Sequence, residues 1–270
     1  MTERRSIGID RRVDVEWLDA VAGQVAAGAE EPAIREAIFK LLDGVVTGGN
    51  KRGTACHKTM GVLSRTWVNV SPETRPLRDR AARLLPQLTK AQRLGLHWAL
   101  LTATYPFFAD VATNTGRLLA LQGNLNLAQL TRRMREEWGD RSTMTRAVQR
   151  VIRSMVQWGV LADSDQRGVY AGAKEPIPVP ATVGELLLEA LLMRHDGESL
   201  PVDQALRHPC FFPFNVELRA HQLRRSARFD VHRQGLDVDV VTLVRTVADE
   251  AFSSAESSKG RIRVSKGSTP

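Results

Sequence analysis

Residues 144–157, MTRAVQRVIRSMVQ, carry the side chains best suited to bind another molecule. At helical spacing their polar residues fall on one side, opposite the apolar ones. That polar side has no carboxylate and consists of Arg146, Gln149, Arg150, Arg153 and Gln157. Arg can pair bidentately with guanine and Gln with adenine, and both also hold phosphate. The pattern therefore favours nucleic acid as the partner.

An ordinary surface helix also turns polar residues outward, but it usually mixes charge signs. Arg146 and Arg150, like Arg150 and Arg153, are like-charge neighbours that cost roughly a few tenths of a kcal/mol per pair. An anion lying opposite the helix would offset that repulsion. The preceding stretch 127–138, LAQLTRRMREEW, does mix arginines with glutamates. This contrast supports the interpretation that the face of 144–157 binds an anion.

Further residues extend the candidate DNA-binding surface. The helix entry, where free backbone N–H groups favour phosphate, contains Arg141, Thr143 and Thr145. Arg167 falls at the tip of a predicted β-hairpin, from which it could reach a minor groove or a phosphate. A second basic group, which a solvated loop explains about as well as a DNA contact, consists of Lys51, Arg52 and Lys58.

Local signals around this stretch define the elements that position it. Asn126 with Gln129 predicts a capped helix that ends at Gly139, and Ser142 is expected to cap the next helix. Residues 162–173, ADSDQRGVYAGA, predict a turn and a returning strand. The order of helix, turn, helix and hairpin is that of a winged helix-turn-helix, whose second helix enters the major groove.

The sequence before and after this module predicts further elements. Upstream, Thr89 and Gln92 form a predicted capping box, and Pro106 suits the first position of a helix that continues to about Gln122. Downstream, KEPIPVPA reads as a linker, Thr182 and Glu185 predict another capped helix, and residues 229–244 predict a β-hairpin.

The expected architecture is mainly α. We predict a helical N-terminal domain at 1–122, a central winged helix-turn-helix at 123–173, a linker at 174–181, a small α+β domain at 182–252 and a disordered basic tail at 253–270.

The composition limits the classes of protein to which the chain can belong. The 270 residues are 43% hydrophobic, as in a globular protein, and the net charge of +8 favours a polyanionic partner. The N-terminus lacks the apolar core of a secretory signal, and no apolar run is long enough to span a membrane. We therefore expect a cytoplasmic protein with no membrane contact.

Catalytic and metal-binding patterns are weak. GGNKRGT (48–54) has the glycine spacing of a phosphate loop, but Thr54 stands where the lysine should be. His208, Cys210 and His221 match no standard metal-site spacing. With no catalytic set visible, we expect no enzymatic activity, no cofactor and no metal.

Three stretches in order carry a family resemblance: KRGTACHK, then LGLHWALLTATYPFFADVATNTGRLLALQ, then EEWGDRSTMTRAVQRVIRSMVQWGVL. Over about residues 30–165 the chain resembles the BrxA-type accessory proteins of BREX bacteriophage-exclusion systems. The resemblance implies double-stranded DNA binding within a multi-protein defence complex, without enzymatic activity.

Several functions stay open at this point. The leading one is a non-enzymatic protein that binds double-stranded DNA, as part of a phage-defence system and alongside other subunits of a defence complex. The alternatives are a scaffold whose winged helix contacts proteins, and a transcriptional regulator. RNA binding fits less well, because aromatics make up only 6% of the chain and are scattered, so no platform for base stacking is apparent.

Overall fold

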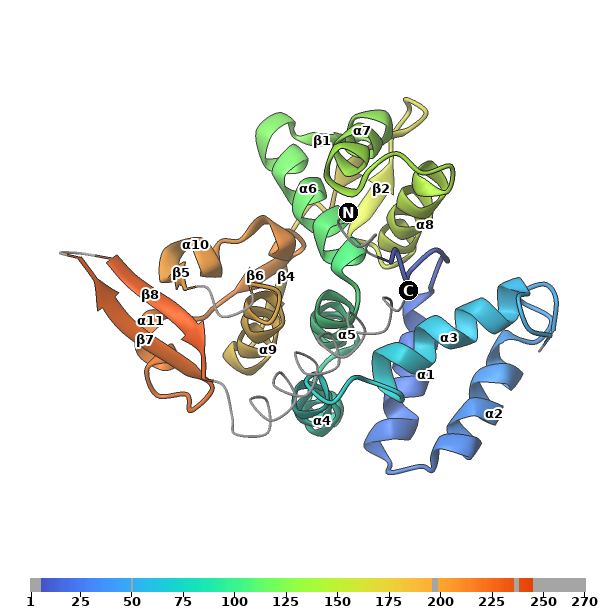
Figure 1. Cartoon of the computed structure of the whole chain (residues 1–270), viewed down its shortest axis with the longest axis horizontal. Helices are drawn as coiled ribbons and strands as arrows, with labels where there is room; N and C mark the ends of the chain where they lie inside the picture. Colours follow the sequence, from blue (N-terminus) through green and yellow to red (C-terminus); the bar gives the residue numbers. More distant parts are fainter. Residues whose placement is uncertain (1–5, 50, 196–198, 236–237, 245–270) are drawn as a thin grey trace, which may run out of the picture.

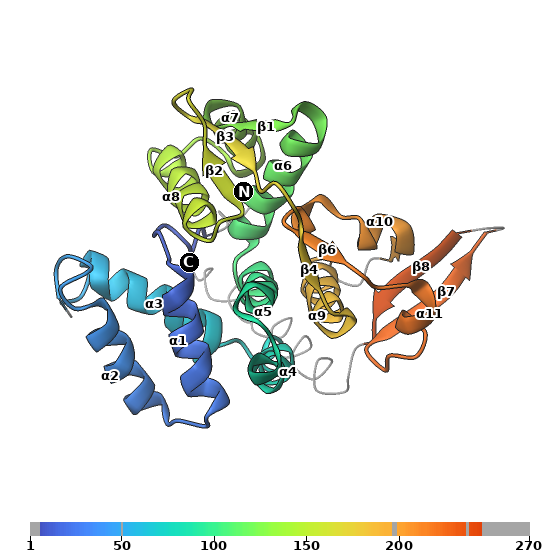
Figure 2. The same cartoon turned by 180° about the vertical axis from the view of Figure 1, so that it is seen from behind.

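The computed structural model describes residues 6–49, 51–195, 199–235 and 238–244. Within them the protein is mainly helical, with three small sheets, which confirms the expected mainly α class. The predicted tail at 253–270 lies outside the described residues. Figures 1 and 2 show the helices and sheets grouped around a central helix, α5.

The N-terminal part consists of helices. They are α1 (Val15–Ala26), α2 (Glu31–Leu42), α3 (Ala55–Trp67), α4 (Arg75–Leu84), the 3-10 turn η1 (Leu85–Gln87), α5 (Lys90–Thr104) and α6 (Pro106–Gln122). Two predicted starts are confirmed. Thr89 and Gln92 form the capping box of α5, and Pro106 is the first residue of α6, which ends at Gln122 before left-handed Gly123.

The central part alternates short strands with two helices. Its elements are β1 (Asn124–Asn126), α7 (Leu127–Trp138), α8 (Met144–Gln157), β2 (Leu161–Asp163) and β3 (Val169–Gly172). The strands form one antiparallel sheet in the order β1-β3-β2, so β3 lies between the strand before α7 and the strand after α8.

The two helix caps predicted for this part have different outcomes. The side chain of Asn126 accepts hydrogen bonds from the amides of Ala128 and Gln129, at 2.9 and 3.1 Å, as expected. The prediction that Ser142 caps the next helix is wrong. Residues 141–143 form a turn in which the Met144 amide donates to the carbonyl of Arg141, so α8 begins at Met144 with no side-chain cap.

The C-terminal part combines short helices with two sheets. Its elements are β4 (Ile177–Val179), α9 (Ala181–Leu192), β5 (Leu200–Pro201), α10 (Val202–Leu206), the 3-10 turn η2 (Pro209–Phe211), β6 (Phe214–Val216), α11 (Ala220–Leu223), β7 (Phe229–Gln234) and β8 (Val238–Leu243). Strand β4 pairs in parallel with β6, and the other three strands form an antiparallel sheet in the order β5-β8-β7. The pairing of β7 with β8 confirms the predicted hairpin.

Two expectations for this part fail because of long-range packing. The stretch 174–181 is not a simple linker, since β4 lies within it and Val179 is buried in the main core. Thr182 does not cap α9. The helix begins one residue earlier, at Ala181, and the Gly184 amide donates to the carbonyl of Pro180.

One hydrophobic core connects the three parts. The Trp98 ring on α5 meets Phe108, Trp158 and Phe214 edge-on, with ring centroids 5.1 to 5.9 Å apart. These partners come from α6, from the end of α8 and from β6. The indole N–H of Trp98 also donates to the carbonyl of Cys210 at 3.0 Å, so its polar atom is satisfied inside the core.

Buried polar groups tie helices together. The Trp67 indole N–H donates to Nδ1 of His97 at 3.1 Å, and Nε2 of His97 lies 2.9 Å from the carboxylate of Asp19. Because Nδ1 accepts, the proton must be on Nε2, which donates to Asp19. Glu189 on α9 likewise pairs with Arg80 of α4 and with Arg228, just before β7.

Gly116 in α6 marks the closest approach between the helix and the C-terminal part. A Cβ at this position would lie 2.0 Å from the backbone carbonyl oxygen of Pro209 in η2. Backbone atoms cannot move aside as a flexible side chain can, so the contact requires glycine here.

We expect Gly116→Ala to lower the free energy of unfolding by at least about 1 kcal/mol, because α6 and η2 must separate. The matched control is Gly61→Ala in α3, where an added Cβ would meet nothing within 4 Å. There the alanine should stabilise the protein by roughly 0.5 to 1 kcal/mol through helix propensity. Urea unfolding of both variants measures the difference, and equal effects of the two would contradict the close contact.

A second prediction concerns pH. Burial lowers the pKa of His97, and burial together with nearby cations lowers the pKa of His208 to about 4. Both histidines are therefore neutral in the folded protein at pH values where the unfolded chain protonates them. Stability should fall as the pH drops below about 6.5, by up to about 1.4 kcal/mol per pH unit for each histidine. Unfolding of His208→Gln between pH 7 and 4 should show a shallower slope than the wild type.

Candidate nucleic-acid interface

The apolar side of α8 belongs to the core. Each residue of the predicted stripe is buried: Met144, Ala147, Val148, Val151, Ile152 and Met155. This fixes the rotation of the helix about its axis. The polar residues between them lie mostly on the other side of the helix, and their surroundings differ along the length of α8.

The second half of α8 is covered by the segment that precedes α1. The Val13 amide donates to Ser154 Oγ at 2.8 Å, and the Trp158 indole returns a bond to the Val13 carbonyl at 2.9 Å. Gln157 accepts from the Val15 amide at 2.8 Å and donates to Glu16 at 2.6 Å. Figures 1 and 2 show this N-terminal segment against the lower end of α8.

Two of the predicted arginines also have partners within the chain. Arg150 donates to the backbone carbonyl of Asp10 and lies 3.8 Å from its carboxylate. Burial, with the nearby charge of Arg11, lowers the pKa of Arg150. Arg153 binds both carboxylate oxygens of Asp163, at 2.7 and 2.8 Å, and this hydrogen bonding raises the pKa of Arg153.

The polar face is therefore not uniform. The sequence suggests an open face free of carboxylates, and that is wrong for the second half of α8, where Asp10 and Asp163 face the arginines. That Arg150, Arg153 and Gln157 contact DNA stays a prediction. Each of these side chains would first have to break an intramolecular hydrogen bond.

The first half of α8 is open. Thr143, Thr145, Arg146 and Gln149 are exposed. Thr145 accepts a hydrogen bond from Arg135 at 3.0 Å, whereas neither Arg146 nor Gln149 has a hydrogen-bond or ion-pair partner within the part of the chain that is described. The helix N-terminus, with its unsatisfied amides, lies at this same end, beside half-buried Arg141.

The turn between β2 and β3 contains exposed charged residues. Arg167 is exposed in it, as predicted for a hairpin tip, and Asp165 in the same turn is exposed too. Ser164 closes the turn by donating to the carbonyls of Gln166 and Val169, at 3.2 and 2.9 Å. The turn thus has a defined shape and mixed charge.

The second basic group lies on other elements. Lys51 and Arg52 are exposed in the turn before α3, and Lys58 is exposed on α3 itself, which packs on α1, α2 and α5. Thr54 caps α3 and also donates to the carbonyls of Gly49 and Lys51. The loop that resembles a phosphate loop in sequence is therefore closed by its own hydrogen bonds.

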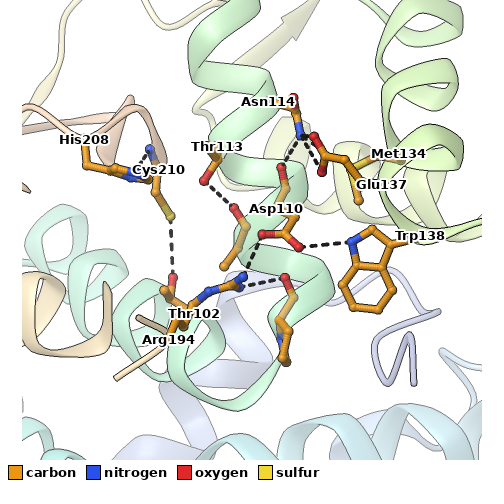
Figure 3. Close-up of polar contacts among 12 residues, drawn as sticks. Thr102, Asp110, Thr113, Asn114, Met134, Glu137, Trp138, Arg194, His208 and Cys210 are labelled. Carbon is orange, nitrogen blue, oxygen red and sulfur yellow. Dashed lines mark hydrogen bonds and ion pairs between the residues drawn. The ribbon is translucent and has the colours of Figure 1, made fainter. Parts of the chain in front are cut away.

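Sequence reasoning missed a polar cluster that holds α7 in place. Asp110 on α6 accepts from the Trp138 indole at 3.0 Å and pairs with Arg194 at 2.7 Å (Figure 3). One helical turn further along α6, Asn114 donates to Glu137 at 3.0 Å. Trp138 and Glu137 are the last residues of α7, so this cluster sets where the turn leading into α8 begins. Only the i, i+4 spacing of Asp110 and Asn114 could have pointed to it.

A scan against models of known protein families, a search among curated proteins and a search among solved structures each found no match. In the described part of the chain, no group of three or more His, Cys, Asp or Glu side chains could hold a metal ion. No described helix is long and apolar enough to cross a membrane.

Because the two halves of α8 have different surroundings, we expect substitutions of Gln149 and Gln157 to change the stability by different amounts. Gln157→Ala leaves the half-buried Val15 amide and the exposed Glu16 without their partner and should cost about 1 kcal/mol of unfolding free energy. Gln149→Ala removes no such bond and should change stability by less than about 0.5 kcal/mol. Urea unfolding measures both, and a Gln149→Ala loss as large as that of Gln157→Ala would show that the first half is not open.

Proposed function

We propose that residues 123–173 form a winged helix-turn-helix that binds double-stranded DNA through the first half of α8. The order β1-α7-α8-β2-β3 and the strand order β1-β3-β2 support this proposal. In such modules the second helix of the pair enters the major groove and contacts base edges with its N-terminal residues. In this chain that helix is α8.

The observation that carries the proposal is the pair Arg146 and Gln149. They lie one turn apart on the exposed side of α8, near its N-terminus, with no partner among the described residues to compete for them. Arg suits guanine and Gln suits adenine, and the helix N-terminus favours a phosphate. In the proposed complex, exposed Thr143 and Arg167 would hold backbone phosphates.

The wider role follows the resemblance to BrxA-type proteins. We propose a non-enzymatic accessory component of a phage-defence complex that acts on DNA in the cytoplasm. A second candidate is a scaffold whose winged helix contacts proteins. The mixed charges of Asp10, Asp163 and Asp165 beside the arginines favour it, because such a surface suits a protein partner better than a polyanion.

Salt-dependent binding to a fluorescent DNA duplex tests the proposal. We expect affinity to fall steeply with salt, with a slope in log–log form of about −0.9 for each phosphate neutralised. Arg146→Ala should weaken binding by about 1 to 3 kcal/mol, the cost of losing a base contact. Arg153→Ala is the matched control: it removes an arginine that is already paired with Asp163, and it should weaken binding much less.

No binding at low salt would contradict the DNA proposal and favour the scaffold. If Arg153→Ala instead lowered affinity as much as Arg146→Ala, the DNA would extend along the whole helix. In that case the assignment to the first half of α8 would be wrong.

A further inference from the structure

A cavity of about 560 Å³ lies between α6, the end of β3 and the η2 turn. Its volume is in the range of small-molecule sites in proteins. Leu119 and Gly116 line it from α6, Gly172 from β3, and Phe211 and Phe212 from η2 and the residue after it. The cavity is thus formed where the central part of the chain meets the C-terminal part.

The lining combines an apolar wall with one guanidinium and one imidazole. Leu119, Val160 and Phe212 supply apolar surface, while Arg207 and His208 also line the cavity. No Asp or Glu is among its lining residues. Arg207 is exposed and has no ion-pair partner in the described part of the chain, and the same holds for Arg117, which follows Gly116 on α6.

His208 presents a hydrogen-bond donor in a fixed form. Its Nδ1 accepts from the Cys210 amide at 3.2 Å, so in the neutral ring the proton is on Nε2 (Figure 3). Burial lowers its pKa, and the nearby positive charges of His195, Arg117 and Arg194 lower it further. Among them, Arg117 is an exposed cation on α6, whereas Arg194 is already paired with Asp110.

We propose that this cavity binds a small organic carboxylate with an apolar body. The carboxylate would accept from His208 Nε2–H and pair with Arg207, and the apolar body would lie against Leu119 and Phe212. A carboxylate has two acceptor oxygens, so it can accept from one neutral donor and pair with one guanidinium at the same time. The proposal is independent of DNA binding, although the cavity shares β3 with the proposed winged helix.

Octanoate and octanol distinguish recognition of the anion from simple apolar binding. They have the same chain length and differ in the charged group. By isothermal titration calorimetry with the full chain, octanoate should bind at least tenfold more tightly than octanol. It should also raise the melting temperature, by an amount that grows with the logarithm of the octanoate concentration above the dissociation constant. Equal binding of the two would overturn the proposal, as would no binding of octanoate at millimolar concentration.

Two variants locate the site, each with a control. Arg207→Glu should abolish octanoate binding, whereas Arg225→Glu, an exposed arginine in the turn after α11, should not. Ala120→Trp places a large ring at the exposed edge of the cavity and should also block octanoate binding. Its control is Ala128→Trp, at an exposed position on α7, which should leave octanoate binding unchanged. Wild-type octanoate binding by Arg207→Glu or by Ala120→Trp would overturn the proposed site.

Discussion

The backbone of residues 10–16 runs along α8 and exchanges hydrogen bonds with side chains in its second half. Val13 uses both its amide and its carbonyl in this way, with Ser154 and Trp158, and its own side chain is fully buried. If these hydrogen bonds were not formed, buried polar groups would be left without a partner, and each would cost about 1 to 3 kcal/mol of stability. The segment is therefore part of the folded core, and it partly covers the second half of α8.

The open half of α8 is positioned by contacts that lie far away in the chain. Asp110 joins the end of α7 to Arg194, which follows α9, and Trp98 packs against the end of α8 and against β6. Gly116 lets η2 approach α6 closely enough to complete this arrangement. The central elements thus share their core with the N-terminal and C-terminal parts, so the orientation of α8 depends on contacts from both.

Local signals in the sequence predict much of this fold. The caps at Thr89 and Asn126 and the proline that starts α6 each act within one helical turn, and each is confirmed. The apolar stripe of α8 is correct for the same reason. The misplaced signals, Ser142 and Thr182, are residues with good capping chemistry whose helices begin elsewhere, because a turn at 141–143 and the strand before Pro180 set the start.

The sequence predicts which residues lie on the polar side of α8, but not how much of that side is open. Helical periodicity places Arg146, Gln149, Arg150, Arg153 and Gln157 on one side of the helix. It contains no information about what lies opposite them. Asp10 is 140 residues from Arg150 in the sequence, and no local pattern pairs them. The same limit applies to β4, whose partner strand β6 follows only after α9 and α10.

DNA cleavage from a tethered reagent tests the central claim, that DNA lies against the first half of α8. Both native cysteines are buried, so a cysteine introduced at Gln149 can be labelled selectively with an iron chelate. The account predicts that the chelate at position 149 cuts a bound duplex, and that the same chelate at exposed Gln204 on α10 does not. Cleavage from position 204 without cleavage from position 149 would contradict it.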